Sequence, residues 1–280
     1  MTFRIGAHVS ISGGVEKAIE RQKEETGNCG QIFAGSPRTW SVSEYEPEDG
    51  EKFLDAREEE DQNPYVIHST YLVNLATPKD DLFEKSLNCL QSELDAASTL
   101  GVEHVVFHPG AHTGSGRETG IRRIAEGIDE LDIPEDVTLL LENTAGKGTT
   151  LGRSMGELRQ MIDHAETSDE KIGVCIDTCH AHAAGYDLVS EEGFQDFIQE
   201  IKEDIGLDRV KVLHLNDSKD ERGSEKDNHE DIGYGNIGEE GFSNVVNSKD
   251  LEDLPMILET PSDNRASYKE NIERLRGLKE

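Results

Sequence analysis

Short apolar runs alternate along the chain with longer amphipathic segments. The runs are rich in β-branched and aliphatic residues without polar alternation, which is typical of strands buried on both faces of a parallel sheet. Eight such runs predict strands, at Arg4–His8, Gln31–Phe33, Tyr65–His68, His104–His108, Val137–Glu142, Ile172–Asp177, Val210–His214 and Met256–Glu259. Helices are predicted between them, at Gly14–Lys23, Gly50–Asp61, Asp80–Leu100, Gly120–Leu131, Ser154–Glu166, Phe194–Ile205 and Tyr268–Leu278.

This alternation predicts an α/β fold, a (β/α)8 TIM barrel. No low-complexity linker or short repeat divides the 280 residues. Because a barrel of about 250 residues is normally one domain, residues 1–280 are expected to form a single domain.

The composition indicates the compartment and the salt concentration to which the protein is suited. No run of about 18 apolar residues or signal-peptide pattern appears, and the four cysteines form no CxxC pair. We therefore expect a cytoplasmic protein with reduced thiols and no membrane association. The formal net charge is −31 and is spread along the chain. Our hypothesis is a protein adapted to a high-salt cytoplasm, where salt screens this self-repulsion. Taken alone, the charge argues against a nucleic-acid partner.

Ionisable residues of metal-binding types mark the ends of consecutive predicted strands. These residues are His68, His108, Glu142, Asp177, His214 and Glu259. In a barrel the carboxyl ends of the strands ring one mouth, where active sites lie. A single histidine at a strand end is more often a hydrogen-bonded structural residue, but unpaired buried ionisable groups are costly. Six in succession therefore indicate a shared positive centre.

Two segments beyond strand ends extend this set. His180 follows Asp177, and an insertion after His214 carries Asp227 and His229. Five imidazoles and four carboxylates exceed the three or four protein ligands of one zinc, so we expect two or three metals. Sites rich in imidazole and without thiolates favour zinc, manganese or iron over magnesium. Clustered metals of this kind are typical of phosphoester or amide hydrolysis.

The remaining histidines are interpreted as structural or solvated rather than as ligands. They are His8, His104, His112, His164 and His182, of which His8 could support the site from the end of the first strand. The stretch Gly233-Tyr-Gly-Asn-Ile-Gly238 predicts a tight loop. It lacks the preceding strand that a dinucleotide-binding motif requires.

Several segments together resemble endonuclease IV, the family of zinc-dependent apurinic/apyrimidinic DNA-repair endonucleases. They are Gly6-Ala-His-Val-Ser10, His68-x-x-Tyr71-Leu-x-Asn74, Phe107-His-Pro-Gly110, Leu141-Glu-Asn-Thr-Ala-Gly146, Val174-Cys-Ile-Asp-Thr-Cys-His-Ala181, Ala184-Gly-Tyr-Asp187, His214-Leu-Asn-Asp217 and Gly235-Asn-Ile-Gly238. The match runs in order from Arg4 to about Thr260. The segment around Asp177 is the most specific part of it.

The resemblance implies three zinc ions (Zn²⁺), with manganese (Mn²⁺) as an alternative at one or more positions. By motif position the three ligand sets are His68, His108 and Glu142; Asp177, His214, Glu259 and the bridging Glu142; and His180, Asp227 and His229. It implies hydrolysis of the phosphodiester bond 5′ to an abasic site, leaving 3′-hydroxyl and 5′-deoxyribose phosphate ends, and removal of blocking groups from 3′ ends. The implied nucleophile is a metal-bridging hydroxide held by the catalytic Glu142.

The resemblance also implies a monomer that binds double-stranded DNA with abasic sites or blocked 3′ ends. Arg38 and Trp40 match one DNA-contacting loop of the family, and Tyr71 and Leu72 match another. For Trp40, packing in the protein interior is an equally weighted interpretation.

The chain also departs from the family pattern, although at no predicted ligand. Gly35 and Ser36 stand where the family often has Lys-Asn, Asn228 stands where Arg is usual, and His182 stands where Phe is usual. The first two departures remove positive charge that would contact phosphate.

Two other classes of protein remain as alternatives. A divalent-metal sugar isomerase or epimerase of similar barrel type would also place acids and histidines at strand ends, but a third ligand set is not expected there. A barrel without catalytic activity would not need every ligand position to be filled.

Overall fold

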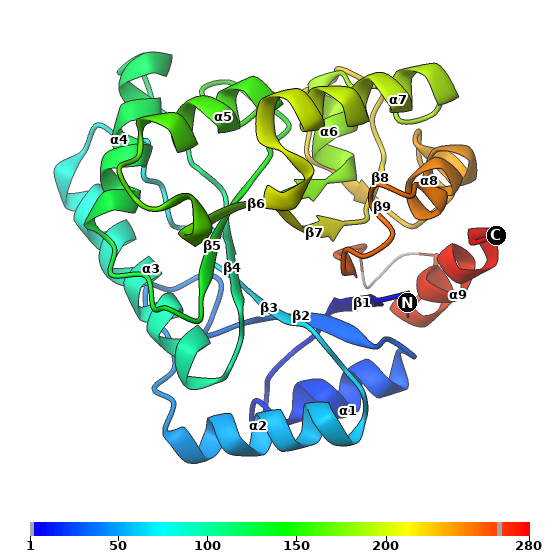
Figure 1. Cartoon of the computed structure of the whole chain (residues 1–280), viewed down its shortest axis with the longest axis horizontal. Coiled ribbons are helices and arrows are strands. Elements are labelled where there is room, and N and C mark those ends of the chain that lie inside the picture. Colours follow the sequence, from blue (N-terminus) through cyan, green and yellow to red (C-terminus); the bar gives the residue numbers. More distant parts are fainter. Residues whose placement is uncertain (1–2, 262–264) are drawn as a thin grey trace.

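The computed structural model describes residues 3–261 and 265–280, whose strands form a closed barrel surrounded by helices (Figure 1). The barrel strands are β1 (Ile5–His8), β2 (Cys29–Phe33), β3 (Tyr65–His68), β4 (His104–Phe107), β5 (Thr138–Glu142), β6 (Ile172–Asp177), β7 (Val210–His214) and β10 (Met256–Leu258). Every strand pairs in parallel with its neighbours in the order β1-β10-β7-β6-β5-β4-β3-β2. The predicted TIM barrel is confirmed.

Helices cover the outside of the barrel, and a small hairpin lies above its mouth. The helices are α1 (Lys17–Glu24), α2 (Pro47–Glu59), α3 (Asp80–Thr99), α4 (Arg117–Glu130), α5 (Met155–His164), α6 (Thr178–Ala184), α7 (Glu191–Glu200), α8 (Gly238–Asn247) and α9 (Tyr268–Leu278). The hairpin consists of β8 (Asp217–Ser218) and β9 (His229–Glu230). All predicted strands and helices are present; β3, β6, β7 and α9 have the predicted bounds, and the others have shifted ends.

The largest differences from prediction lie in the second half of the chain. Helix α6 was not predicted; it starts directly after Asp177, whose Oδ1 accepts a hydrogen bond from the His180 N–H at 2.8 Å. Helix α8 was also missed, although its buried Phe242, Val245 and Val246 have helical spacing. The helix predicted to begin at Phe194 begins at Glu191 and continues as a π-helical segment over Ile201–Ile205.

Two layers of side chains fill the barrel. The lower layer is a buried apolar cluster of Cys29, Val66, Val106, Leu140, Cys175, Val212 and Ile257. Side chains two residues apart along a strand share a face. The polar residues two positions further along therefore form a layer directly above: Gln31, His68, His108, Glu142, Asp177, His214 and Glu259. The alternate strand positions, such as Ile32 and Ile67, belong to a separate core that includes residues of the helices.

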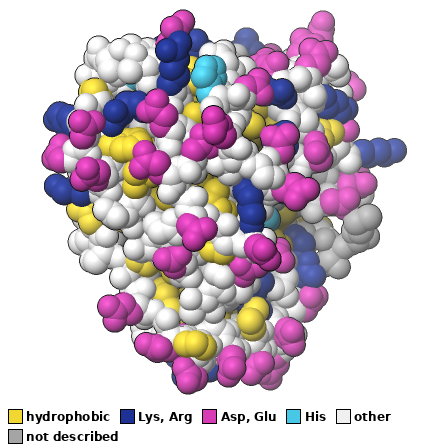
Figure 2. Space-filling model, turned by 60° about the vertical axis from the view of Figure 1, so that its left-hand side comes forward, with side chains coloured by type: hydrophobic (Ala, Val, Ile, Leu, Met, Phe, Trp, Pro, Cys, Tyr) yellow, Lys and Arg dark blue, Asp and Glu magenta, His cyan; other side chains and the backbone are white. Residues whose placement is uncertain are grey.

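The outer surface is strongly acidic. Figure 2 shows Asp and Glu side chains scattered over one face, with fewer Lys and Arg between them and only small apolar areas. Among the described helices, none combines the length and the apolar character needed to cross a membrane. Negative charge is spread over the face shown in Figure 2 and is not gathered in one part of it.

Candidate metal centre

The upper layer of the barrel supplies six of the nine predicted ligands, and helix α6 and the segment from Asp227 to His229 bring the other three beside it. The nine ligands form three groups, each with ligand atoms within 4.8 Å of one another: His68, His108 and Glu142; Glu142, Asp177, His214 and Glu259; and His180, Asp227 and His229. Glu142 belongs to two of these groups. The predicted arrangement of side chains is therefore present, with His108 and Glu259 one residue beyond the ends of β4 and β10.

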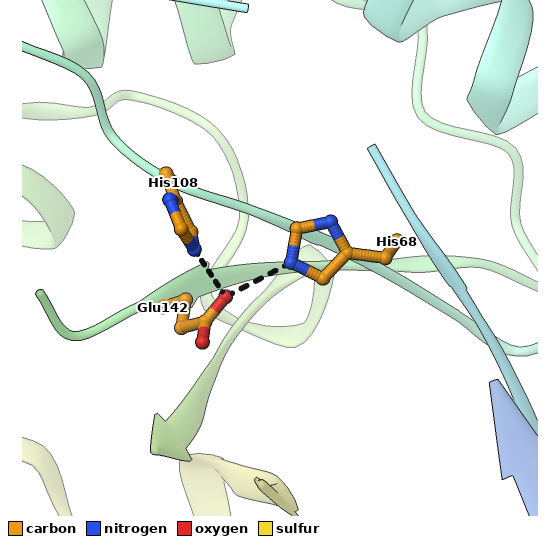
Figure 3. Close-up of side chains that lie close together, drawn as sticks. All are labelled: His68, His108 and Glu142. Atoms are coloured by element: carbon orange, nitrogen blue, oxygen red, sulfur yellow. Dashed lines mark hydrogen bonds and ion pairs between the residues drawn. The ribbon is translucent and has the colours of Figure 1, made fainter. Parts of the chain in front are cut away.

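Glu142 occupies the centre of the layer, fully buried (Figure 3). Its Oε2 lies 3.1 Å from His68 Nε2 and 2.9 Å from His108 Nε2. Its Oε1 lies 3.0 Å from His214 Nδ1. Burial by itself raises the pKa of Glu142, but the nearby imidazoles of His108 and His214 outweigh it and hold the pKa well below its usual value. The carboxylate is thus ionised, as a bridging ligand must be.

Each of four imidazoles donates one ring N–H to an outer acceptor. The pairs are His68 Nδ1 with Ser69 O at 2.8 Å, His180 Nδ1 with Asn143 O at 2.9 Å, His229 Nδ1 with Glu259 O at 3.2 Å, and His214 Nε2 with Gln31 Oε1 at 2.8 Å. The other nitrogen of each ring faces the carboxylates. This pattern is typical of metal-binding histidines, whose second nitrogen is fixed by an outer partner.

The third group depends on the segment between β8 and β9. Asp227 Oδ2 lies 3.2 Å from His180 Nε2, and its Oδ1 lies 3.2 Å from His229 Nε2. The segment is held by buried Asp217, whose carboxylate accepts backbone N–H groups of the predicted glycine-rich loop, namely those of Gly233, Gly235, Ile237 and Gly238. The loop and the hairpin are therefore fixed together beside α6.

The charge balance of the centre fits a set of bound cations. Glu142, Asp177 and Glu259 lie in one group, and no Lys or Arg in the described part of the chain forms an ion pair with them. Nε2 of His229 is buried and lies 3.2 Å from Asp227 Oδ1. Burial lowers the pKa of His229, but its hydrogen bond to Asp227 and the charge of Asp177 raise it to about 9. Clustered buried carboxylates require positive partners, which bound metal ions would supply.

Cysteine thiols are poor competitors for this role. Cys175 lies close to Glu142 and His214, and Cys179 lies close to Asp177 and His229. Burial raises the pKa of Cys179 to about 12 and that of Cys175 well above its usual value. Because the thiolate is the metal-binding form, these buried thiols are less readily available as ligands than the nitrogen and oxygen donors.

A cavity of about 550 Å³ opens above the centre. Its wall includes His68, His108, His180, Asp227, His229 and Glu259, together with Phe33, Tyr71 and Tyr268. Tyr71 is 64% exposed at the rim, with its ring 5.5 Å from that of Phe33. The centre is thus accessible to a ligand from the mouth of the barrel.

The predicted DNA contacts differ in exposure. Arg38 is exposed and Leu72 is partly buried. Trp40 is partly buried and packs against the hydrophobic core, which favours its packing role. Asn228 lines the cavity, and its side-chain amide donates to Asp220 Oδ2 at 2.7 Å.

Two further residues contact the ligands: Gln31, which was not predicted as part of the site, and His8, which was considered only as a possible support for it. Gln31 lies in the same barrel layer and donates from Nε2 to Glu259 Oε1 at 2.6 Å. His8 lies with its Nδ1 3.5 Å from the same oxygen. The alternation of inward positions would have revealed Gln31, because Cys29 and Gln31 share the inner face of β2. Of the other histidines, His104, His112, His164 and His182 belong to none of the described ligand groups, as expected.

Another buried carboxyl, that of Glu93, lies outside the centre. Glu93 on α3 accepts a hydrogen bond from the Thr70 backbone N–H at 2.9 Å, and its Oε2 is buried without a partner. The Thr70 hydroxyl in turn donates to Pro37 O at 2.7 Å, so the contact links both loops that carry the predicted DNA contacts. Burial raises the pKa of Glu93 to about 7.

Glu93→Gln is expected to stabilise the protein at pH 8 but not at pH 5. A raised carboxyl pKa means that the folded state holds the proton more tightly, so wild-type stability falls as pH rises from about 4.5 towards 7. Glutamine keeps the acceptor for Thr70 and removes the ionisation, a gain of about 2–3 kcal/mol at most. Urea unfolding at both pH values measures this gain. Glu84→Gln on the exposed face of α3 is the control, and an equal gain at both pH values would contradict the assignment.

Comparisons with known proteins agree with this geometry. A family described as "Xylose isomerase-like TIM barrel" matches residues 24–278. Proteins named "Probable endonuclease 4" from Haloarcula marismortui and Natronomonas pharaonis are 48% and 47% identical to the chain. Each match covers 99% of this chain and 99% of the relative. The crystal structure of endonuclease IV from Thermus thermophilus has a TM-score of 0.87 at 37% identity, covering 98% of both chains. A D-tagatose 3-epimerase-like protein shares the fold at 20% identity, with a TM-score of 0.74 and coverage of 98% of this chain and 96% of that one.

Proposed function

Because the chain belongs to the endonuclease IV family, we propose that it is a DNA-repair endonuclease acting on abasic sites in double-stranded DNA. It cuts the phosphodiester bond 5′ to the site, leaves 3′-hydroxyl and 5′-deoxyribose phosphate ends, and removes blocking groups from 3′ ends. The observation that carries the proposal is the joining of three ligand groups at one mouth, two of which share Glu142.

The three groups are suited to three zinc ions. Bound zinc would supply Lewis acidity, which lowers the pKa of water and stabilises negative charge on phosphate oxygens. Nitrogen and oxygen ligands suit zinc and also manganese. The assignment of groups is the one predicted, with Glu142 common to the first and second and with His180, Asp227 and His229 forming the third.

The protein's own residues account for placement of the reacting groups. Glu142 presents one oxygen towards His68 and His108 and the other towards His214, so its carboxylate fixes the spacing of the first two groups. The third group adjoins the other two through His180, whose Nδ1 lies 3.4 Å from Glu142 Oε1 and whose Nε2 lies 3.2 Å from Asp227 Oδ2. Its three members line the cavity. A phosphate entering the cavity therefore meets ligand groups on more than one side. This suits in-line displacement, where attacking and leaving oxygens need separate stabilisation.

The rim residues are suited to hold DNA rather than a small sugar. Exposed Arg38 and Tyr71 lie on separate loops, after β2 and after β3, and Thr70 connects these loops through Pro37. The exposed ring of Tyr71 beside the cavity provides a surface for stacking or for insertion at a site without a base. We propose that these loops contact the duplex on either side of the abasic nucleotide.

A direct test is incision of a duplex with a single abasic site, in molar KCl without magnesium. We expect one cut, 5′ to the site, that is lost after prolonged chelation and restored by zinc. Mapping both product ends by gel electrophoresis and mass spectrometry identifies the reaction. The same duplex without the abasic site is the control. An intact duplex, despite metal shown to be bound, would favour the sugar isomerase or epimerase alternative, which shares the fold.

A further inference from the structure

We propose that Gln31 is a positioning residue that sets the ring orientation of His214 and the carboxylate orientation of Glu259, and thereby the metal affinity of the second ligand group. The inference rests on the proposed metal-dependent function. Gln31 comes from β2, which contributes none of the nine ligands, and is fully buried within the ligand layer.

Three hydrogen bonds define its place. His214 Nε2 lies 2.8 Å from Gln31 Oε1, and Gln31 Nε2 lies 2.6 Å from Glu259 Oε1. The same amide nitrogen lies 3.0 Å from His8 Nδ1. Both hydrogens of the amide and its oxygen are therefore directed at named partners, two of which are ligands.

The chemistry of these partners fixes the direction of every hydrogen. An ionised carboxylate only accepts hydrogen bonds, so the atom 2.6 Å from Glu259 Oε1 must be the amide nitrogen. The amide oxygen then faces His214 Nε2, which must carry a hydrogen. A neutral His214 consequently has its lone pair on Nδ1, 3.0 Å from Glu142 Oε1 and 3.6 Å from Glu259 Oε2. Gln31 thus selects the nitrogen that His214 offers to a metal.

His214 differs from the other oriented imidazoles in its outer partner. The rings of His68, His180 and His229 donate to backbone carbonyls, which no substitution of the partner side chain removes. His214 donates to a side chain. Its orientation is therefore open to change by a single mutation. Loss of such outer partners typically weakens metal binding about 10- to 100-fold.

Gln31→Leu removes the donor and the acceptor while keeping a side chain of similar length. We expect zinc affinity of one site to fall about 10- to 100-fold, measured by competition with a chelator and by zinc content after dialysis. Incision should regain near wild-type rates at saturating zinc, because no group that contacts substrate is lost. Because bound metal also stabilises a folded protein by mass action, urea unfolding of the metal-free variant is measured as well and separates a loss of metal affinity from a folding defect.

The matched control is Gln62→Leu. Gln62 is another buried glutamine, which accepts from the Tyr65 hydroxyl at 2.8 Å and donates to Ile19 O at 3.1 Å before the start of β3. We expect this variant to lose stability without a change in zinc affinity. Equal zinc affinity in Gln31→Leu and wild type, or equal loss in both variants, would overturn the proposal.

A measurement on the wild type keeps the test valid if Gln31→Leu does not fold. Nitrogen-15 NMR of the zinc-loaded protein should show His214 with a hydrogen on Nε2 and metal bound at Nδ1; the reverse would overturn the proposal. Neither readout needs DNA. Zinc binding without incision would reject the proposed endonuclease activity alone, whereas incision with unchanged zinc affinity in Gln31→Leu would reject the role of Gln31 alone.

Discussion

Glu142→Gln is expected to abolish incision and to lower the zinc content by up to two ions per chain. The carboxylate contacts His68, His108 and His214 while fully buried, and belongs to two ligand groups. Removing one partner from a buried ion pair costs about 3–5 kcal/mol, equivalent to about 10²- to 10⁴-fold in metal affinity. The glutamine side chain keeps the shape of glutamate but offers only one oxygen. Its N–H group can donate a hydrogen bond to the imidazole lone pair that would otherwise bind a metal. Zinc analysis of the dialysed variant, with gel-based incision assays, measures both effects.

His229→Gln provides the matched contrast. His229 belongs only to the third group among the ligand groups with nitrogen and oxygen donors, so this variant should lose a single zinc and also lose incision. A sugar isomerase or epimerase that needs the first two groups would keep its activity in this variant. If Glu142→Gln retained both the full zinc content and incision, the bridging role of Glu142 would be wrong.

Lowering the KCl concentration is expected to destabilise the protein strongly. With a net charge of −31 and acidic groups spread over the surface, self-repulsion grows as screening weakens. The Debye length increases from about 3 Å at 1 M salt to about 10 Å at 0.1 M. We expect weaker screening to lower the free energy of unfolding by several kcal/mol. Because about 1 kcal/mol corresponds to 2–4 °C in large domains, the Tm should fall by more than about 10 °C between these concentrations. Scanning calorimetry of the zinc-loaded protein across a KCl series measures the change.

A charge-reduced variant is the control for this experiment. Glu58 and Glu59 are exposed at the end of α2, and replacing both with Lys should flatten the dependence of Tm on KCl. Equal Tm values at low and molar KCl in the wild type would contradict adaptation to high salt. The same screening weakens DNA binding that depends on phosphate charge, so few basic residues would be needed around the cavity of such an enzyme.

Sequence patterns predicted the barrel because two independent signals coincided. The apolar runs located the strands, and the ionisable residues at the ends of six consecutive runs located one mouth of the barrel, since parallel strands all end at the same side. His68, Glu142, Asp177 and His214 could therefore be brought together before any coordinates were known. Their distances follow from the register of neighbouring strands, such as Asp177 beside His214.

Other features depended on contacts that no periodic pattern encodes. Helix α6 is seven residues long and starts within the motif at Asp177, where the side chain caps it. The position of Asp227 depends on the carboxylate of Asp217, which gathers the backbone N–H groups of a loop distant in sequence. Gln31 was overlooked because an uncharged amide is not a metal ligand, and its role appears only through the partners that surround it.

The apolar layer beneath the ligands closes the lower end of the barrel. Val66, Leu140 and Val212 are fully buried there, so ions cannot leave through the far end of the barrel. Metal ions and substrate would therefore have to enter through the same mouth above the centre. A DNA duplex bound over that mouth would block the exit of the metal ions. The ions would then stay in place during the reaction.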